Sequence, residues 1–179
     1  MRQSSVSPTC LVLQKTSSAV SSAYALLDDV MQWLRRRRIN VSKEVSGLTK
    51  SRSERVDVLV RCEGLVYWCD VSVAEPASAS YLEQSCKKAG WAASKAEAAK
   101  TSKWKKFAPS GVRVQPLVME TSGRVGRAMG TFLKTMEKAS ASGATDTYSR
   151  SDLVMQLSVT CLRFNAQCVR EAVDGEPVL

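Results

Sequence analysis

The sequence predicts an α/β domain in which a mixed central sheet of about four strands is flanked by helices, with an extra helix at the C-terminal end. Three observations lead to this fold class. Two runs rich in β-formers flank a Glu-Gly pair, a long alanine-rich stretch lacks proline, and apolar residues recur at helical spacing near both ends. The 179 residues are enough for one domain with a buried core, and a hydrophobic content of 44% is typical of globular proteins.

The N-terminal third contains a serine-rich segment, a helix and a strand. Residues 1–17 are rich in serine, and we expect them to be disordered. Residues 18–37 predict a helix because apolar side chains recur there at helical spacing, and a run of four arginines follows its last apolar turn. The segment INVSKEV at 39–45 alternates apolar and polar residues, so it predicts a short strand that carries Glu44.

Residues 55–76 predict a β-hairpin with its turn at Glu63-Gly64. Asp57 lies six residues before Glu63, and Asp70 lies six residues after Gly64. In a hairpin folded symmetrically about this pair the two aspartates face each other, with Cβ atoms roughly 4.5–5.5 Å apart. Two like charges opposed at this distance are destabilising unless a cation lies between them, and a divalent metal ion is the obvious candidate.

One long helix is expected over residues 80–107, beginning at the S-x-x-E capping pattern of Ser80, with Gly90 as its weak point. A helical stripe through this segment is apolar except at Lys100. A lysine centred on a buried stripe needs an acidic partner or a functional reason. The expected inward stripe consists of Leu82, Cys86, Ala89, Ala93, Ala96, Lys100 and Trp104.

The C-terminal part predicts a strand at 111–120, where Pro116 indicates a bulge or an edge position, and a helix at 124–139. We divide the chain into the disordered N-terminal segment, a core over residues 18–138, and a flexible loop with a C-terminal helix over residues 139–179. No internal repeat is evident.

Composition restricts the chemistry and the partners. The chain has no histidine, which excludes Ser-His-Asp and Cys-His catalysis, and its six cysteines form no Cys-x-x-Cys pair, so we expect reduced thiols in an intracellular protein. The formal charge of +9 and the pI of about 9.5 indicate a polyanionic partner. No apolar run reaches the ~20 residues of a membrane span, so we expect no membrane-spanning helix. Nucleic acid and an anionic membrane surface would both suit the positive charge, and of the two we predict nucleic acid and no membrane.

Carboxylates and lysines therefore have to carry any catalysis. Glu44, Asp57 and Asp70 on adjacent strands offer the oxygen ligands that Mg²⁺ or Mn²⁺ prefers. Lys100 is placed to orient a water molecule or to neutralise charge on a phosphate, and Glu120 at a strand end is a weaker catalytic candidate. Basic residues on the long helix and at the end of the first helix are expected to hold a nucleic-acid backbone: Lys95, Lys103, Lys105, Lys106, Arg35, Arg36, Arg37 and Arg38. For the four arginines, a phosphate contact or a nuclear-import patch is the functional interpretation, and simple capping of a solvated helix end is an equal alternative.

Several segments resemble the restriction-like endonuclease domain of site-specific non-long-terminal-repeat retrotransposons, a branch of the PD-(D/E)xK nuclease superfamily. The similarity covers roughly residues 22–137 and rests on WLRRRRINVSKEV, RVDVLV, WCDVSVAEP and AEAAKTSKWKKF, with FLKTM as a later match. It implies a restriction-endonuclease-like core and a magnesium-dependent DNA endonuclease. The metal-binding acids would be Asp57 and Asp70, with Glu44 as a further acid, and Lys100 would be the lysine that this branch carries on the following helix.

The chain departs from that pattern at several positions. Val56 replaces the usual proline before the first acid, Ser72 stands where the parent pattern has lysine, and Lys103 competes with Lys100 for the lysine role. No polymerase domain accompanies the segment, so the resemblance implies a detached fragment of a mobile element. Its partners would be the DNA backbone and a reverse transcriptase or parent polyprotein, in the nucleus.

Two other interpretations stay open. A catalytically inactive nuclease fold would bind nucleic acid through its basic face without cutting it. A structural protein would instead satisfy its aspartates by salt bridges to Arg55, Arg61 or Lys100. The sequence does not indicate an oligomeric state.

Overall fold

The computed structural model describes residues 17–46, 55–140 and 147–174. The elements follow the predicted order of helix, three strands, helical segment, strand and two helices. They are α1 (Ser17–Arg36), β1 (Asn40–Ser46), β2 (Arg55–Cys62), β3 (Leu65–Ala74), α2 (Leu82–Lys87), α3 (Trp91–Lys105), β4 (Val112–Glu120), α4 (Arg127–Ala139) and α5 (Arg150–Asp174).

The strands form one open, mixed sheet in the order β1-β2-β3-β4, which confirms the predicted α/β class with about four strands. The pairs β1–β2 and β2–β3 are antiparallel, and β3–β4 is parallel. The parallel pair requires a crossover connection, and α2 and α3 supply it. Pro116 lies in β4, an edge strand, as its lack of an N–H predicted.

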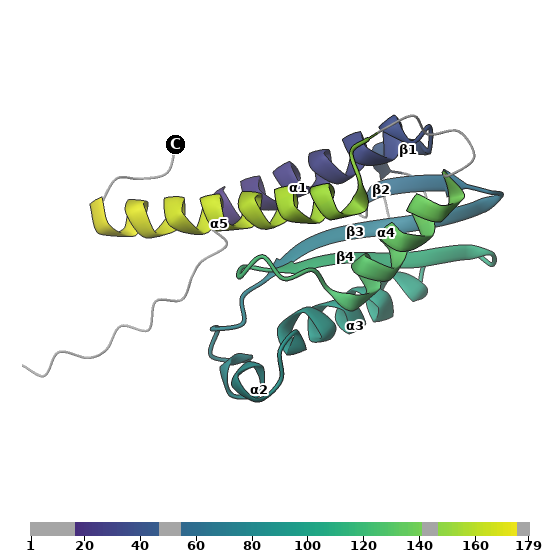
Figure 1. Cartoon of the computed structure of the whole chain (residues 1–179). Helices are drawn as coiled ribbons and strands as arrows, with labels where there is room; N and C mark the ends of the chain where they lie inside the picture. The colour runs from purple at the N-terminus through teal and green to yellow at the C-terminus, as the bar shows by residue number, and fades with distance from the viewer. Residues whose placement is uncertain (1–16, 47–54, 141–146, 175–179) are drawn as a thin grey trace, which may run out of the picture.

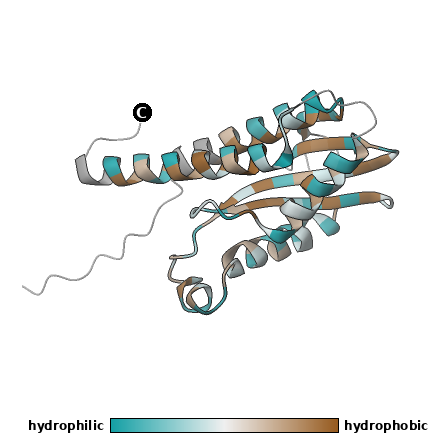
Figure 2. Cartoon of the chain, in the orientation of Figure 1, coloured by the Kyte–Doolittle hydropathy of each residue, from teal (hydrophilic) through white to brown (hydrophobic). Residues whose placement is uncertain are grey.

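Helices cover both faces of the sheet (Figure 1). On one face α1, α4 and α5 bury a large apolar cluster against the sheet, which includes Leu34, Val60, Leu117, Leu133 and Leu157. On the other face α3 packs through Trp104 against Trp68 and Leu59, and through its alanines against Val118. Figure 2 shows hydrophobic residues concentrated along the central strands between these layers.

The helix expected over residues 80–107 is in fact two helices, so this prediction was wrong. The chain breaks at Gly90, whose φ of 78° lies in the left-handed region that a residue inside a helix does not adopt. The capping box at Ser80 does not form either, since α2 begins after Tyr81 without a side-chain cap. The stripe therefore holds only in α3, where Ala93 and Trp104 are buried, whereas Leu82 in α2 is 48% exposed.

The remaining predictions differ mainly at element ends. The helix predicted at 124–139 begins at Arg127 because Val125 instead forms a β-bridge with Met119. The predicted disordered segment falls on residues outside the described part of the chain, except Ser17, with which α1 begins. Most of the flexible loop predicted at the start of the 139–179 segment lies outside it as well. No helix in the described ranges has the length and apolar character of a membrane span.

Candidate active site

The hairpin turn brings Asp57 and Asp70 together. Glu63 and Gly64 have φ values of 49° and 73°, the pair of left-handed residues that a two-residue type I′ turn requires. The paired residues run from Cys62 with Leu65 to Val58 with Cys69, which is the register predicted from the symmetry of the turn. One step further along the two strands lie Asp57 and Asp70, and their carboxyl groups are close enough for Asp70 to raise the pKa of Asp57.

Asp70 is buried and held from two sides by residues of α3. It is 6% exposed. The Lys100 ammonium donates to Asp70 Oδ1 at 2.8 Å, and the Trp104 indole N–H donates to Asp70 Oδ2 at 2.7 Å. Lys100 also donates to the carbonyl oxygen of Val71 at 3.2 Å. Because Lys100 and Trp104 are four residues apart on one helix face, both reach the same carboxylate.

Asp57 is the member of the pair whose ionised form is disfavoured. Its Oδ2 accepts the backbone N–H of Val71 at 2.8 Å, which favours the ionised form. Partial burial is the larger effect and, together with the Asp70 carboxyl, it raises the pKa of Asp57 to about 6. At neutral pH the pair therefore carries electrostatic repulsion that Lys100 offsets in part.

Lys100, and not Lys103, contacts Asp70. The Lys103 ammonium lies over the ring of Trp104, 4.5 Å from its centroid, and its side chain is exposed. Lys100 is partly exposed, with 27% of its side chain accessible to solvent. A substrate group arriving from solvent can therefore reach it.

Glu44 does not join the pair. The pairs Lys43–Val58 and Val45–Val56 place it opposite Asp57 in the sheet, but its backbone has a φ of 51° and its carboxylate forms an ion pair with Arg55 at 3.3 Å. Within the described ranges, no three His, Cys, Asp or Glu side chains are grouped so as to hold a metal ion. The predicted three-carboxylate set is thus reduced to two.

Two further buried acids serve as helix caps. Glu120 is 3% exposed, and its Oε1 accepts the N–H of Ala93 in the first turn of α3, at 3.2 Å. Glu120 lies four positions along β4 from Pro116, the register partner of Asp70, or roughly 13 Å along the strand, so it is not part of the site. Glu97, which sequence reasoning missed, accepts the N–H of Ala128 at the start of α4 at 2.8 Å.

The basic residues gather at the end of the sheet where the hairpin turns. The last turn of α1 leads into Asn40, which pairs with Arg61, and α3 ends close to Val112, which pairs with Val66 (Figure 1). The following predicted nucleic-acid contacts are exposed there or on the outer face of α3: Arg35, Arg36, Arg38, Lys95, Lys103, Lys105 and Lys106.

Arg37 is the exception among the predicted backbone contacts. It is only 8% exposed, its guanidinium stacks on the ring of Trp33 at 4.1 Å, and it donates to the carbonyl oxygen of Tyr148 at 3.0 Å. These contacts tie α1 to the segment before α5. We therefore remove Arg37 from the predicted nucleic-acid contacts.

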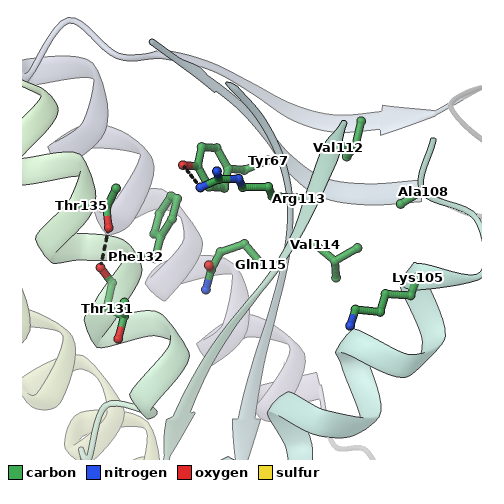
Figure 3. A pocket seen from close by; sticks show the side chains of 10 residues that line it. All are labelled: Tyr67, Lys105, Ala108, Val112, Arg113, Val114, Gln115, Thr131, Phe132 and Thr135. Carbon is green, nitrogen blue, oxygen red and sulfur yellow. Dashed lines mark hydrogen bonds between the residues drawn. The ribbon is translucent and has the colours of Figure 1, made fainter. Parts of the chain in front are cut away.

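A cavity of about 480 Å³ lies elsewhere, around the free edge of β4 between α3 and α4 (Figure 3). Its lining includes Arg113, Gln115 and Lys105, and the Arg113 guanidinium lies 3.5 Å from the Tyr67 hydroxyl. None of the site residues Asp57, Asp70 or Lys100 lines it. The amide of Gln115 donates to the carbonyl oxygen of Pro116 at 2.9 Å, which closes part of this strand edge to pairing with another strand.

No protein-family model matches the chain, and no curated protein matches its sequence.

The hydrogen bonds of Trp104 and Glu97 were only weakly indicated by the sequence. Trp104 marked the inward face of the helix, but the spacing gave no indication that its N–H bonds Asp70. Glu97 lies three residues before Lys100, close to the same face of the helix. Its position so near a buried stripe is the only indication in the sequence that this glutamate has a buried partner.

Proposed function

We propose that this protein is a metal-dependent endonuclease that hydrolyses DNA phosphodiester bonds on a restriction-endonuclease-like core. The observation that carries the proposal is the proximity of the Asp57 and Asp70 carboxyl groups, with the Lys100 ammonium bonded to Asp70. The resemblance to the endonuclease domain of non-long-terminal-repeat retrotransposons supports the same assignment, because Asp57, Asp70 and Lys100 are three of the four residues that it singles out. The fourth, Glu44, pairs with Arg55 instead.

The residues at the site fit a hard divalent cation. The donors that meet there are all oxygens, namely the two carboxylates and the carbonyl of Val71, the type that Mg²⁺ and Mn²⁺ prefer. Burial and, after it, the Asp70 carboxyl raise the pKa of Asp57, and a dication would offset the cost of its buried negative charge. Asp57 and Asp70 would hold the ion, which when bound polarises a phosphodiester and lowers the pKa of a bound water.

The side chains around the acids position them and compensate charge. Trp104 and the N–H of Val71 fix the orientations of Asp70 and Asp57. Lys100 neutralises charge that develops on a phosphate oxygen, and its partial exposure leaves it accessible to that oxygen. The exposed lysines and arginines at the hairpin end of the sheet contact the DNA backbone without reading its sequence.

A second candidate function is nucleic-acid binding without cleavage. One observation favours it: both oxygens of Asp70 already have partners within the chain, Lys100 and Trp104. A lysine that neutralises the acid pair in this way reduces the attraction for a metal ion. In that case the basic surface provides the function and the acid pair is a structural remnant.

Nicking of supercoiled plasmid DNA separates the two candidates. The endonuclease is expected to nick the plasmid with Mg²⁺ or Mn²⁺ and to lose this activity in Asp57→Asn and Asp70→Asn. Glu83→Gln, which changes an exposed acid on α2, is the control and is expected to keep the activity. DNA binding that weakens steeply with salt, without nicking under any metal condition, would select the second candidate. Absence of both activities would refute both.

A further inference from the structure

Helix α5 carries two apolar seams on opposite sides. One seam, with Leu153, Leu157 and Cys161, is buried against the body of the protein. The other is exposed along the described side chains of the helix and consists of Met155, Val159, Leu162, Ala166 and Val169. Four of its members are large apolar residues between 40% and 63% exposed. An exposed row of this size is unusual on a protein surface, where apolar residues are normally scattered.

The spacing of the exposed seam is that of a coiled coil. Its members are separated by four, three, four and three residues, which is the a/d repeat of a heptad with an average period of 3.5. With Val159 and Ala166 as a positions, the d positions are Met155, Leu162 and Val169. A strict a/d row forms a narrow stripe, which suits a partner helix better than a membrane surface, where the apolar face is broad.

The distal part of α5 projects from the body. The last buried residue among the described side chains of α5 is Cys161, and the helix continues to Asp174, past the start of α1 (Figure 1). The exposed seam continues along this projecting part to Val169. Because packing against α1 already holds the first half of the helix, a partner would meet a preformed surface and lose little entropy in ordering it.

The two edges of the seam differ in their chemistry. On one edge, Ser158 and Asn165 donate to carbonyl oxygens of the turn after β4. On the other edge, Arg163 and Arg170 are exposed at successive e positions. A second copy would bring no acid to these arginines in either a parallel or an antiparallel pairing, and the formal charge of +9 opposes self-association.

We propose that the exposed seam of α5 docks an amphipathic helix of another protein, one with apolar residues at alternating spacings of three and four and Asp or Glu residues along the edge that faces Arg163 and Arg170. The apolar seam supplies the affinity, and the arginines select an acidic partner and fix its register. This inference does not depend on the proposed nuclease function.

The probe is a synthetic helix of about three heptads with Leu and Val at a and d and Glu at every e and g, which prevents it from pairing with itself. A second peptide has Lys in place of every Glu. Fluorescence anisotropy measures the binding of each peptide to the full chain. We expect the Glu peptide to bind about tenfold more tightly than the Lys peptide.

Variants assign the binding to the seam. Leu162→Glu should weaken binding of the Glu peptide by about tenfold or more, whereas Leu82→Glu, at a leucine of similar exposure on α2, should leave it unchanged. The double variant R163E/R170E should reverse the preference in favour of the Lys peptide. Loss of folding cannot produce such a reversal. The control for this double variant is Lys134→Glu, which reverses a positive charge at an exposed position on α4.

Four results would overturn the proposal. The first is equal binding of the two peptides, or no binding. The second is a dimer in sedimentation velocity that Leu162→Glu dissociates, which would make a second copy the occupant. The third is Glu-peptide binding only after removal of residues 1–16, which would make that segment the occupant. The fourth is seam-dependent binding to phosphatidylserine vesicles with no peptide binding, which would make a membrane surface the target.

Discussion

Replacing Asp57 by asparagine should stabilise the fold at neutral and alkaline pH. Asparagine keeps an oxygen that can accept the N–H of Val71, but it removes the charge that burial and Asp70 make unfavourable. Because the folded pKa of Asp57 is raised, its favourable contribution is complete below the unfolded value of 3.8 and is lost as the pH rises through about 6. Above that pH the wild-type protein carries the full cost of the charge.

The size of the effect follows from the two pKa values. A rise from 3.8 to about 6 corresponds to about 3 kcal/mol for a fully buried group. Asp57 is only partly buried, so solvent screening reduces the expected gain from Asp57→Asn to about 1–2 kcal/mol near pH 8. Near pH 4 the aspartate is already protonated in the folded state, and the gain should fall below about 0.5 kcal/mol.

Urea unfolding followed by tryptophan fluorescence at the two pH values measures this difference. Asp28→Asn is the control, because Asp28 is an exposed acid whose ion pair with Lys43 makes its removal slightly destabilising, by at most about 0.5 kcal/mol, near pH 8. A destabilised Asp57→Asn protein near pH 8, or an equal effect at both pH values, would refute the interpretation that the charge of Asp57 destabilises the fold.

Three other substitutions, with Gly130→Ala as a comparison for one of them, test the architecture around the site through the free energy of unfolding in urea. Trp104→Phe removes the N–H that Asp70 accepts and should cost about 2 kcal/mol; a loss below about 0.5 kcal/mol would show that the bond is not significant. Gly90→Ala should destabilise the fold by about 1–2 kcal/mol because its backbone is left-handed; a steric clash is not the reason, since the new Cβ would meet its nearest neighbour at an ordinary 3.5 Å. Gly130→Ala, inside α4, should stabilise the fold by about 0.5–1 kcal/mol. Equal effects of the two substitutions would contradict the helix break at Gly90. Glu97→Ala should cost about 1–2 kcal/mol by removing the cap of α4, and a neutral result would rule out that role.

Local rules were enough to predict the two elements that build the acid pair and its lysine. A Glu-Gly turn fixes the register of a hairpin, so the facing of Asp57 and Asp70 followed from counting residues. Helical spacing counted from Leu82 placed Lys100 on the inward face, and within α3 that spacing holds.

The failures come from tertiary contacts that local patterns do not encode. The predicted helix broke because Gly90 adopts a left-handed turn and Glu120, distant in sequence, caps the new helix that follows. Arg37 was grouped with its exposed neighbours, but Trp33 and the carbonyl of Tyr148 provide it with a buried site. Glu44 occupied the expected register position, and a neighbouring arginine engaged its carboxylate instead.

Isothermal titration calorimetry of Mn²⁺ binding to the full chain near neutral pH tests most directly whether Asp57 and Asp70 form a cation site. We predict binding in the wild-type protein and in Glu83→Gln, and loss of binding in both Asp57→Asn and Asp70→Asn, with Asp57→Asn still folded and more stable than the wild type above pH about 6. Binding that persists unchanged in both aspartate variants, or no binding in the wild-type protein, would contradict this account of the site.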